Sequence, residues 1–112
     1  KLVANENIEV KQLGKGQLAS QVSDWNTKGY LAISDSVKEV YGDIIVAPGL
    51  MVGGSDSKHY GKAAKNSFRF NPYSIVPEDM TGIHGTNESI DIDSFVAGIK
   101  TDVEIIKEGS SK

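Results

Sequence analysis

A short, uninterrupted apolar run limits the possible folds of this chain more than any other feature. The run is "DIIVAPGLMV", residues 43–52, in which Pro48 and Gly49 end the strand-like part. A continuous apolar stretch of this length is typical of a strand that is buried on both faces. Residues 43–48 are therefore predicted to form a central strand of a sheet.

Two amphipathic helices are predicted on either side of this run. Asp24 is placed to cap the first helix, and Gly42 is placed to end it. The apolar positions of the first helix are Trp25, Ile33, Val37, Val40 and Tyr41. Asp91 is placed to cap the second helix, over residues 92–107. Its apolar face holds Ile92, Phe95, Val96, Ile99, Val103 and Ile106. If this face packs on the sheet, Ile99→Ala should cost about 2–5 kcal/mol.

Two further segments alternate apolar and polar residues, the period of a half-buried strand. Residues 1–13 alternate up to the break "GKGQ", and residues 66–73 place Phe68 and Phe70 around Arg69. A polar, loop-like stretch, residues 74–89, precedes the last helix. The order of strand, helix, strand, helical turn, strand, loop and helix predicts an α/β layer arrangement.

Composition narrows the functional classes. The 112 residues carry a net charge of -3 and 38% hydrophobic residues, which fits one soluble domain or part of a larger one. No basic cluster suggests nucleic acid, and no apolar run approaches the roughly 18 residues of a membrane span. The chain has no cysteine, which excludes disulfides and thiolate metal sites and leaves the compartment undetermined.

The stretch "GGSDSKHY", residues 53–60, follows the predicted central strand. In open α/β sheets, ligands bind beyond the carboxyl ends of the strands. Adjacent glycines let a ligand approach the backbone, and N–H groups at a following helix start favour an anion. A tight turn with Ser55 or Asp56 as a helix cap explains the same residues, and from this stretch alone it is favoured. The glycine spacing matches neither a phosphate loop nor a nucleophile elbow, which argues against serine hydrolysis through Ser55 and a histidine.

A second polar stretch, "GIHGTNES" (residues 82–89), places His84 between glycines. A lone histidine is more often structural or solvated than a metal ligand. A catalytic zinc needs about three protein ligands, and the only other imidazole belongs to His59. Taken alone, the chain is short of ligands for a metal centre.

Taken in order, these stretches resemble one family. "DIIVAPGLMVGGSDSKHY", then "SFRFNP", then "GIHGTNESIDIDSF" closely resemble the C-terminal part of the aminoacylase and carboxypeptidase S-like zinc metallopeptidases. That family has a strand ending in V-x-P, a G-G-[TS]-D-[SA]-R-x-[YF] turn, a Y-R-F-x-P strand, and H-G-x-N-E before the last helix. "LASQVSDW", residues 18–25, is similar to the family's return from its lid domain. The resemblance covers about residues 18–107.

The resemblance implies a fold and a domain division. The expected fold is the C-terminal portion of an α/β sheet sandwiched by helices. Residues 1–16 would be the last strand of the lid domain plus a hinge at Gly14, Lys15 and Gly16. Residues 17–112 would be the C-terminal segment of the catalytic domain.

The resemblance also implies roles for individual residues. His84 matches the last ligand of a two-zinc site, and Asn87 and Glu88 match residues that hold its loop. Gly54 and Ser55 match a turn that meets the substrate's carboxylate. The expected substrate is a small peptide or an N-acyl amino acid.

Lys58 should supply a further donor to that carboxylate, but it stands where the family usually has arginine. A bidentate clamp becomes a point charge there. Gln21 replaces a usual proline.

The family's other zinc ligands and its general base lie N-terminal to the lid, and none can be matched here. The chain is therefore expected to contain no catalytic residue of its own and to depend on the N-terminal part of the same enzyme. The alternative is a free-standing, non-catalytic α/β module that binds a small carboxylate or a partner protein.

Overall fold

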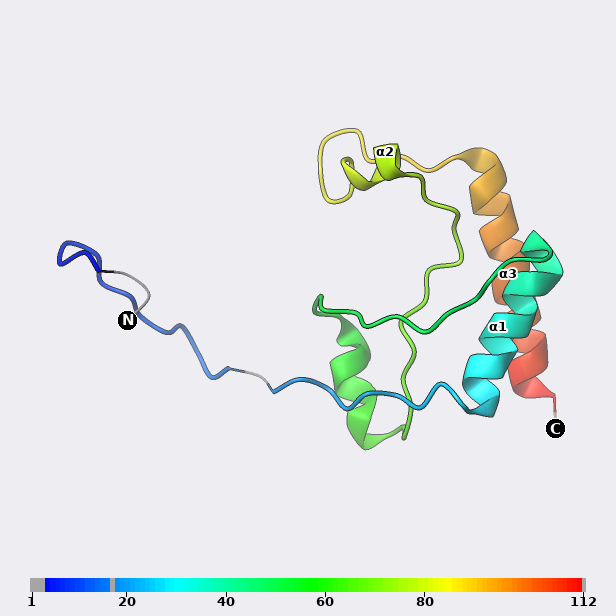
Figure 1. The fold of residues 1–112 in the computed structure, drawn as a ribbon, viewed down its shortest axis with the longest axis horizontal. Helices are drawn as coiled ribbons and strands as arrows, with labels where there is room; N and C mark the ends of the chain where they lie inside the picture. The colour runs from blue at the N-terminus through cyan, green and yellow to red at the C-terminus, as the bar shows by residue number, and fades with distance from the viewer. Residues whose placement is uncertain (1–3, 17, 112) are drawn as a thin grey trace.

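The computed structural model describes residues 4–16 and 18–111. All regular elements within these ranges are helical (Figure 1). They are α1 (Lys28–Tyr41), the 3₁₀ helix η1 (Asp56–Lys62), the single turn α2 (Pro77–Met80) and α3 (Ile92–Ser110).

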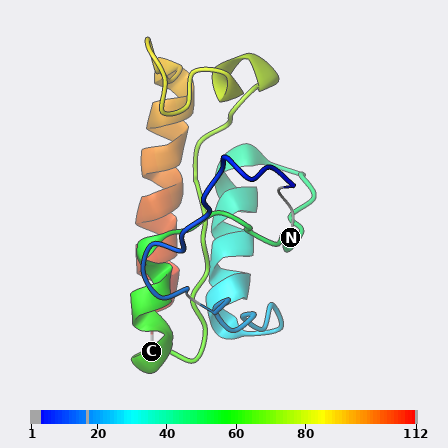
Figure 2. The same ribbon diagram turned by 90° about the vertical axis from the view of Figure 1, so that its left-hand side faces the viewer.

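The two long helices pack against each other and run in opposite directions (Figure 2). Their buried residues are mostly small: Ser34, Ser36 and Val37 on α1, and Ser94, Gly98 and Thr101 on α3. The three α3 positions recur at intervals of four and three residues, so they share one face of the helix. Small side chains on that face allow neighbouring segments to approach the helix axis closely.

The helix ends follow local sequence signals. The Asp91 side chain accepts a hydrogen bond from the Ser94 amide at 2.9 Å, which confirms the predicted cap of α3. Gly42 ends α1 as predicted, with φ at 81°. The start of α1 was predicted too early, because the Asp24 carboxylate accepts from the Asn26 amide, at 2.8 Å, in a turn before the helix. Thr27 precedes the first helical residue instead.

The predicted α/β sheet is wrong for the described residues, which contain no strand. Residues 43–52 and 66–73 run between the helices without regular secondary structure, and the side chains of Ile45 and Val52 are 96% and 93% exposed. A strand requires a neighbour to pair with its backbone N–H and C=O groups. No such neighbour lies beside the apolar run within the described part of the chain.

The predicted strand over residues 1–13 is wrong in the same way. Residues 1–3 lie outside the described ranges, and residues 4–13 form no strand and are exposed. They contain a turn in which the Ile8 amide donates to the Asn5 carbonyl oxygen at 3.2 Å. The division between residues 1–16 and residues 17–112 stays a prediction.

The predicted core face of the last helix is also wrong. Ile99 is 47% exposed, and its apolar neighbours on α3 are exposed as well. The predicted loss of about 2–5 kcal/mol on Ile99→Ala required a buried side chain, so it no longer applies. The small residues Ser94, Gly98 and Thr101 form the buried face in its place.

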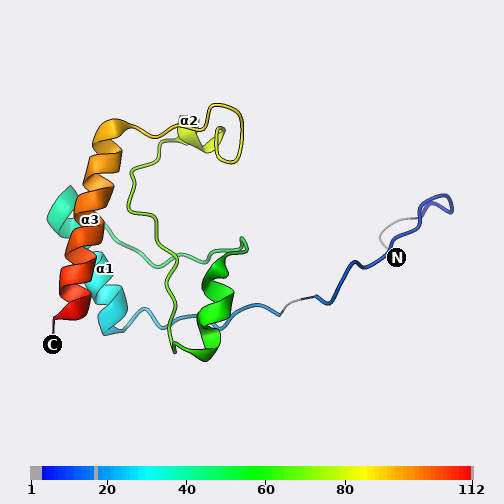
Figure 3. The same cartoon turned by 180° about the vertical axis from the view of Figure 1, so that it is seen from behind.

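The chain is open rather than compact (Figure 3). Its radius of gyration is 18.6 Å, whereas a compact domain of this length has about 13 Å. Residues 4–16 extend away from the helices in Figures 1 and 3, and η1 and α2 lie apart from the α1–α3 pair. Among the helices of the described ranges, none has the length and apolar character to cross a membrane.

Candidate functional site

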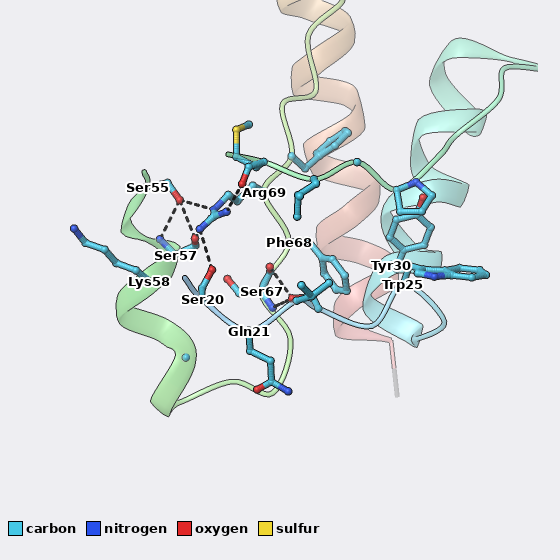
Figure 4. A pocket seen from close by; sticks show the side chains of 18 of the residues that line it. Ser20, Gln21, Trp25, Tyr30, Ser55, Ser57, Lys58, Ser67, Phe68 and Arg69 are labelled. Carbon is cyan, nitrogen blue, oxygen red and sulfur yellow. Dashed lines mark hydrogen bonds between the residues drawn. The ribbon is translucent and has the colours of Figure 1, made fainter. Parts of the chain in front are cut away.

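A pocket of about 1030 Å³ lies where four segments of the chain meet (Figure 4). The segments are residues 18–25, the first half of α1 with Tyr30 and Ile33, the run that leads into η1, and residues 64–70. Apolar side chains such as Phe68 form part of the wall, and the serines of the Gly53–Gly54 turn form another part. The pocket therefore contains the stretch that the sequence predicts to meet a substrate.

Ser23 joins two of these segments. Its hydroxyl donates to the Ser67 carbonyl oxygen at 2.9 Å and accepts from the Ser67 amide at 2.8 Å. One hydroxyl thus pairs with both backbone groups of a residue 44 positions away, as a peptide group of a neighbouring strand would. The Asn66 side chain adds a third bond by accepting from the Asp24 amide at 2.9 Å. These bonds hold the two pocket walls together.

We expect Ser23→Ala to lower the free energy of unfolding by about 1–3 kcal/mol, because two partly buried hydrogen bonds are lost and the Ser67 backbone is left unpaired. Urea denaturation of the protein measures this. The control is Ser110→Ala, which removes only a bond within α3, to the Lys107 carbonyl oxygen. Equal midpoints for the two variants would contradict the prediction.

The Gly53–Gly54 turn leads into η1, and Ser55 is the residue before its first turn. The Ser55 side chain accepts from the Ser57 amide at 3.3 Å, so the cap that the sequence favoured is present. A Cβ atom built on Gly54 would meet nothing within 4 Å. The described chain itself therefore does not require glycine at that position, and the space beside it is open to a ligand.

Arg69 is a residue of this site that was not among the predicted site residues. Its Nε–H group donates to Ser55 Oγ at 2.8 Å and to Ser57 Oγ at 2.6 Å. Two signals were available: Arg69 matches the arginine of the family's Y-R-F-x-P motif, and it lies between Phe68 and Phe70. Its partners lie 12 and 14 residues earlier in the chain, and no local pattern identifies them.

Lys58 lies in η1 and is exposed. Figure 4 shows its side chain extending away from the group formed by Ser55, Ser57 and Arg69. Gly54, Ser55 and Lys58 are thus neighbours on one turn, but the lysine points outward.

The His84 loop lies elsewhere, after α2. His84 is exposed and has a positive φ of 59°, and the Glu88 carboxylate accepts from its backbone amide at 3.1 Å. Asn87 has a positive φ of 63°, so the loop is tightly turned. In all three ribbon views the segment after α2 lies apart from η1. The structure does not bring His84 together with Ser55 and Lys58.

The donor set around His84 does not by itself suit a zinc ion. Within residues 4–16 and 18–111, no group of three or more histidine, cysteine or acidic side chains is placed to hold a metal. A catalytic zinc is bound by about three protein ligands. His84 could supply one of them, and the others would have to come from outside this set.

Comparison with known protein families identifies the class of protein to which this chain belongs. Residues 5–108 match the family described as peptidase family M20/M25/M40, and the chain belongs to that family. Peptidases of this family are generally metal-dependent.

The chain is also similar to individual curated proteins. The chain is 32% identical to the Bos taurus "N-fatty-acyl-amino acid synthase/hydrolase PM20D1" and 31% identical to its Homo sapiens counterpart, each time over 98% of this chain and 22% of the relative. It is 22% identical to "Probable carboxypeptidase S-like 2" of Dictyostelium discoideum, over 85% of this chain and 18% of that protein. The chain thus spans about a fifth of the length of these curated relatives. No solved structure matches it.

Proposed function

We propose that this chain is a segment of a zinc-dependent metallopeptidase or amidohydrolase that cleaves a peptide or N-acyl amide bond next to a free carboxylate. The observation that carries the proposal is the family match over residues 5–108. Relatives named as N-fatty-acyl-amino acid synthase/hydrolases and as carboxypeptidase S-like proteins support this substrate class. An N-acyl amino acid and the carboxyl end of a peptide each carry an amide bond beside a free carboxylate. The family match favours this hydrolase over a non-catalytic binding module.

The rest of the same enzyme is the proposed partner of this segment. Two apolar surfaces support this: the run over residues 43–52, and the α3 stripe that includes Ile99. Exposed apolar surface on this scale marks an interaction site in a soluble protein. The partner would also supply the remaining zinc ligands and the carboxylate that acts as general base. His84 would contribute one imidazole ligand, on a loop held by Glu88.

The test is hydrolysis by the polypeptide that contains this segment. N-acyl amino acids and short peptides with a free carboxyl end are the substrates, with and without zinc. We expect hydrolysis by the complete polypeptide with zinc, and none by residues 1–112 alone. A complete, zinc-loaded polypeptide that cleaves neither substrate class would overturn the proposal.

Lys58 is proposed to add positive charge beside the carboxylate. Lys58→Ala in the complete enzyme should raise KM for free-carboxylate substrates by about fivefold, because an exposed charge contributes only about 1 kcal/mol. Substrates with an amidated carboxyl group should be almost unaffected. Steady-state kinetics on matched pairs measures this, and equal losses for both members of a pair would mean that Lys58 is structural.

A further inference from the structure

The guanidinium of Arg69 is fixed at one edge and loosely held at the other. Its Nε–H group is shared between the hydroxyls of Ser55 and Ser57, which are themselves 2.8 Å apart (Figure 4). The terminal nitrogens make only long contacts: Nη1 lies 3.4 Å from the Met51 carbonyl oxygen, and Nη2 lies 3.3 Å from Ser20 Oγ. Hydrogen bonds of this kind are usually 2.7–3.2 Å long, so the terminal edge is weakly bonded.

The terminal edge has unused donors. A guanidinium carries five N–H groups, four of them on the two terminal nitrogens. Two of these four are engaged in the long contacts with Met51 and Ser20. The other two have no hydrogen-bond partner among the residues that the structure describes.

The positive charge of Arg69 is also unpaired. The ion pairs in the described ranges are Lys11 with Glu9 and Lys107 with Glu104, and neither involves Arg69. Arg69 is partly buried in the pocket wall, and its partners there are neutral hydroxyl and carbonyl groups. A charge that is partly removed from water without a counter-ion is unfavourable, so an incoming anion gains from binding there.

The geometry favours a planar anion. Two terminal nitrogens of one guanidinium form a fork that matches the two oxygens of a carboxylate, whereas an ammonium group is a point charge. The outward-pointing Lys58 cannot provide such a fork. Ser55 and Ser57 hold the Nε edge, and this sets the direction in which the terminal edge faces.

We propose that Arg69 binds the free carboxylate of the substrate through Nη1 and Nη2, and that Ser55 and Ser57 orient its guanidinium. The inference rests on the proposed function and assigns the specificity for a free carboxylate to Arg69. Lys58 then adds only a screened charge, and the turn serves mainly to hold the arginine.

The test uses the complete enzyme with Arg69→Gln and Arg69→Lys. Each is assayed on an N-acyl amino acid and on the carboxamide of the same compound. We expect Arg69→Gln to lower kcat/KM for the free acid by about 10- to 100-fold, mainly through KM, since a charged hydrogen-bond pair is lost. The carboxamide should change less than about threefold. Arg69→Lys should recover part of the loss, because it restores the charge but not the fork.

The control is Lys62→Gln, which removes a positive charge at the end of η1, the helix that carries Ser57 and Lys58. It should leave both rates unchanged. Circular dichroism checks that each variant is folded. If Arg69→Gln is unfolded, the comparison rests on Arg69→Lys, which should still lose preference for the free acid. Equal losses on acid and carboxamide would overturn the inference and make Arg69 a structural residue.

A second measurement separates this inference from the proposed function. Calorimetry measures binding of the N-acyl amino acid and its carboxamide to wild type and to Arg69→Gln. Tight binding of the acid that depends on Arg69, without hydrolysis by the wild type, would sustain the inference and reject the proposed function. Hydrolysis by the wild type, with binding that is independent of Arg69, would do the reverse.

Discussion

His84→Ala in the complete enzyme should lower hydrolysis by more than about 100-fold and reduce the bound zinc. Residues that only support a metal ligand already cost about 10–100-fold when they are removed, so loss of a ligand itself should cost more. The fold should stay intact, because the His84 side chain is exposed and packs in no core. Metal analysis, steady-state rates and thermal unfolding of the same preparation measure the three effects separately.

The matched control is His59→Ala. His59 is also exposed, but it lies in η1, and the family motif does not fix its position. It should keep its zinc and most of its activity. A His84→Ala enzyme with full zinc and full activity would show that the loop after α2 is not the metal-ligand loop.

Helices could be predicted from this sequence because their signals are local. The carboxylate of Asp91 reaches an amide three residues away, and Gly42 ends α1 through its own backbone conformation. Both signals can be read within a few residues of the helix end. The early start predicted for α1 has the same origin: Asp24 does bind a nearby amide, but it does so in a turn. The sequence signal for a cap and for such a turn is the same.

The sheet could not be predicted correctly because pairing is not local. Residues 43–48 have the composition of a doubly buried strand, but whether they form one depends on which segments lie beside them. The described residues provide no such neighbour, and the run is exposed. The prediction for Ile99 failed for the same reason, because its apolar stripe was predicted to pack on that sheet.

In the candidate site, too, local features could be predicted and non-local contacts could not. The resemblance could point to Ser55 and Lys58 because they belong to one short motif. Arg69 reaches Ser55 from 14 residues further along the chain, and only the folded structure shows this contact. The Ser23–Ser67 pairing spans 44 residues and has no sequence signal at all. Non-local hydrogen bonds therefore determine which polar residues form the pocket.

The helix pair fixes the other end of the segment that carries Arg69. Tyr41 on α1 donates its hydroxyl hydrogen to the Pro72 carbonyl oxygen at 2.6 Å, and Ser94 on α3 donates to the Ser74 carbonyl oxygen at 2.9 Å. Tyr73, between them, stacks on Phe95, with ring centroids 5.9 Å apart. Residues 72–74 are thus attached to both helices.

Gly98 makes room for the Tyr73 ring on α3. A Cβ atom built at Gly98 would overlap the Tyr73 side chain, so Gly98→Ala must push the ring away from the helix. We expect the free energy of unfolding to fall by about 1–3 kcal/mol, the usual cost of overpacking, even though alanine favours a helix. Urea denaturation of the protein measures the change.

Gly109→Ala is the matched control, because it makes the same substitution on the same helix where a new Cβ meets nothing within 4 Å. Alanine has the higher helix propensity, so this variant should gain up to about 1 kcal/mol. A Tyr73→Ala background completes the experiment. Without the ring, Gly98→Ala should no longer destabilise the protein, since two residues in contact are coupled and the coupling disappears with either partner. If Gly98→Ala stabilises the protein as much as Gly109→Ala does, the Tyr73 ring does not lie against α3.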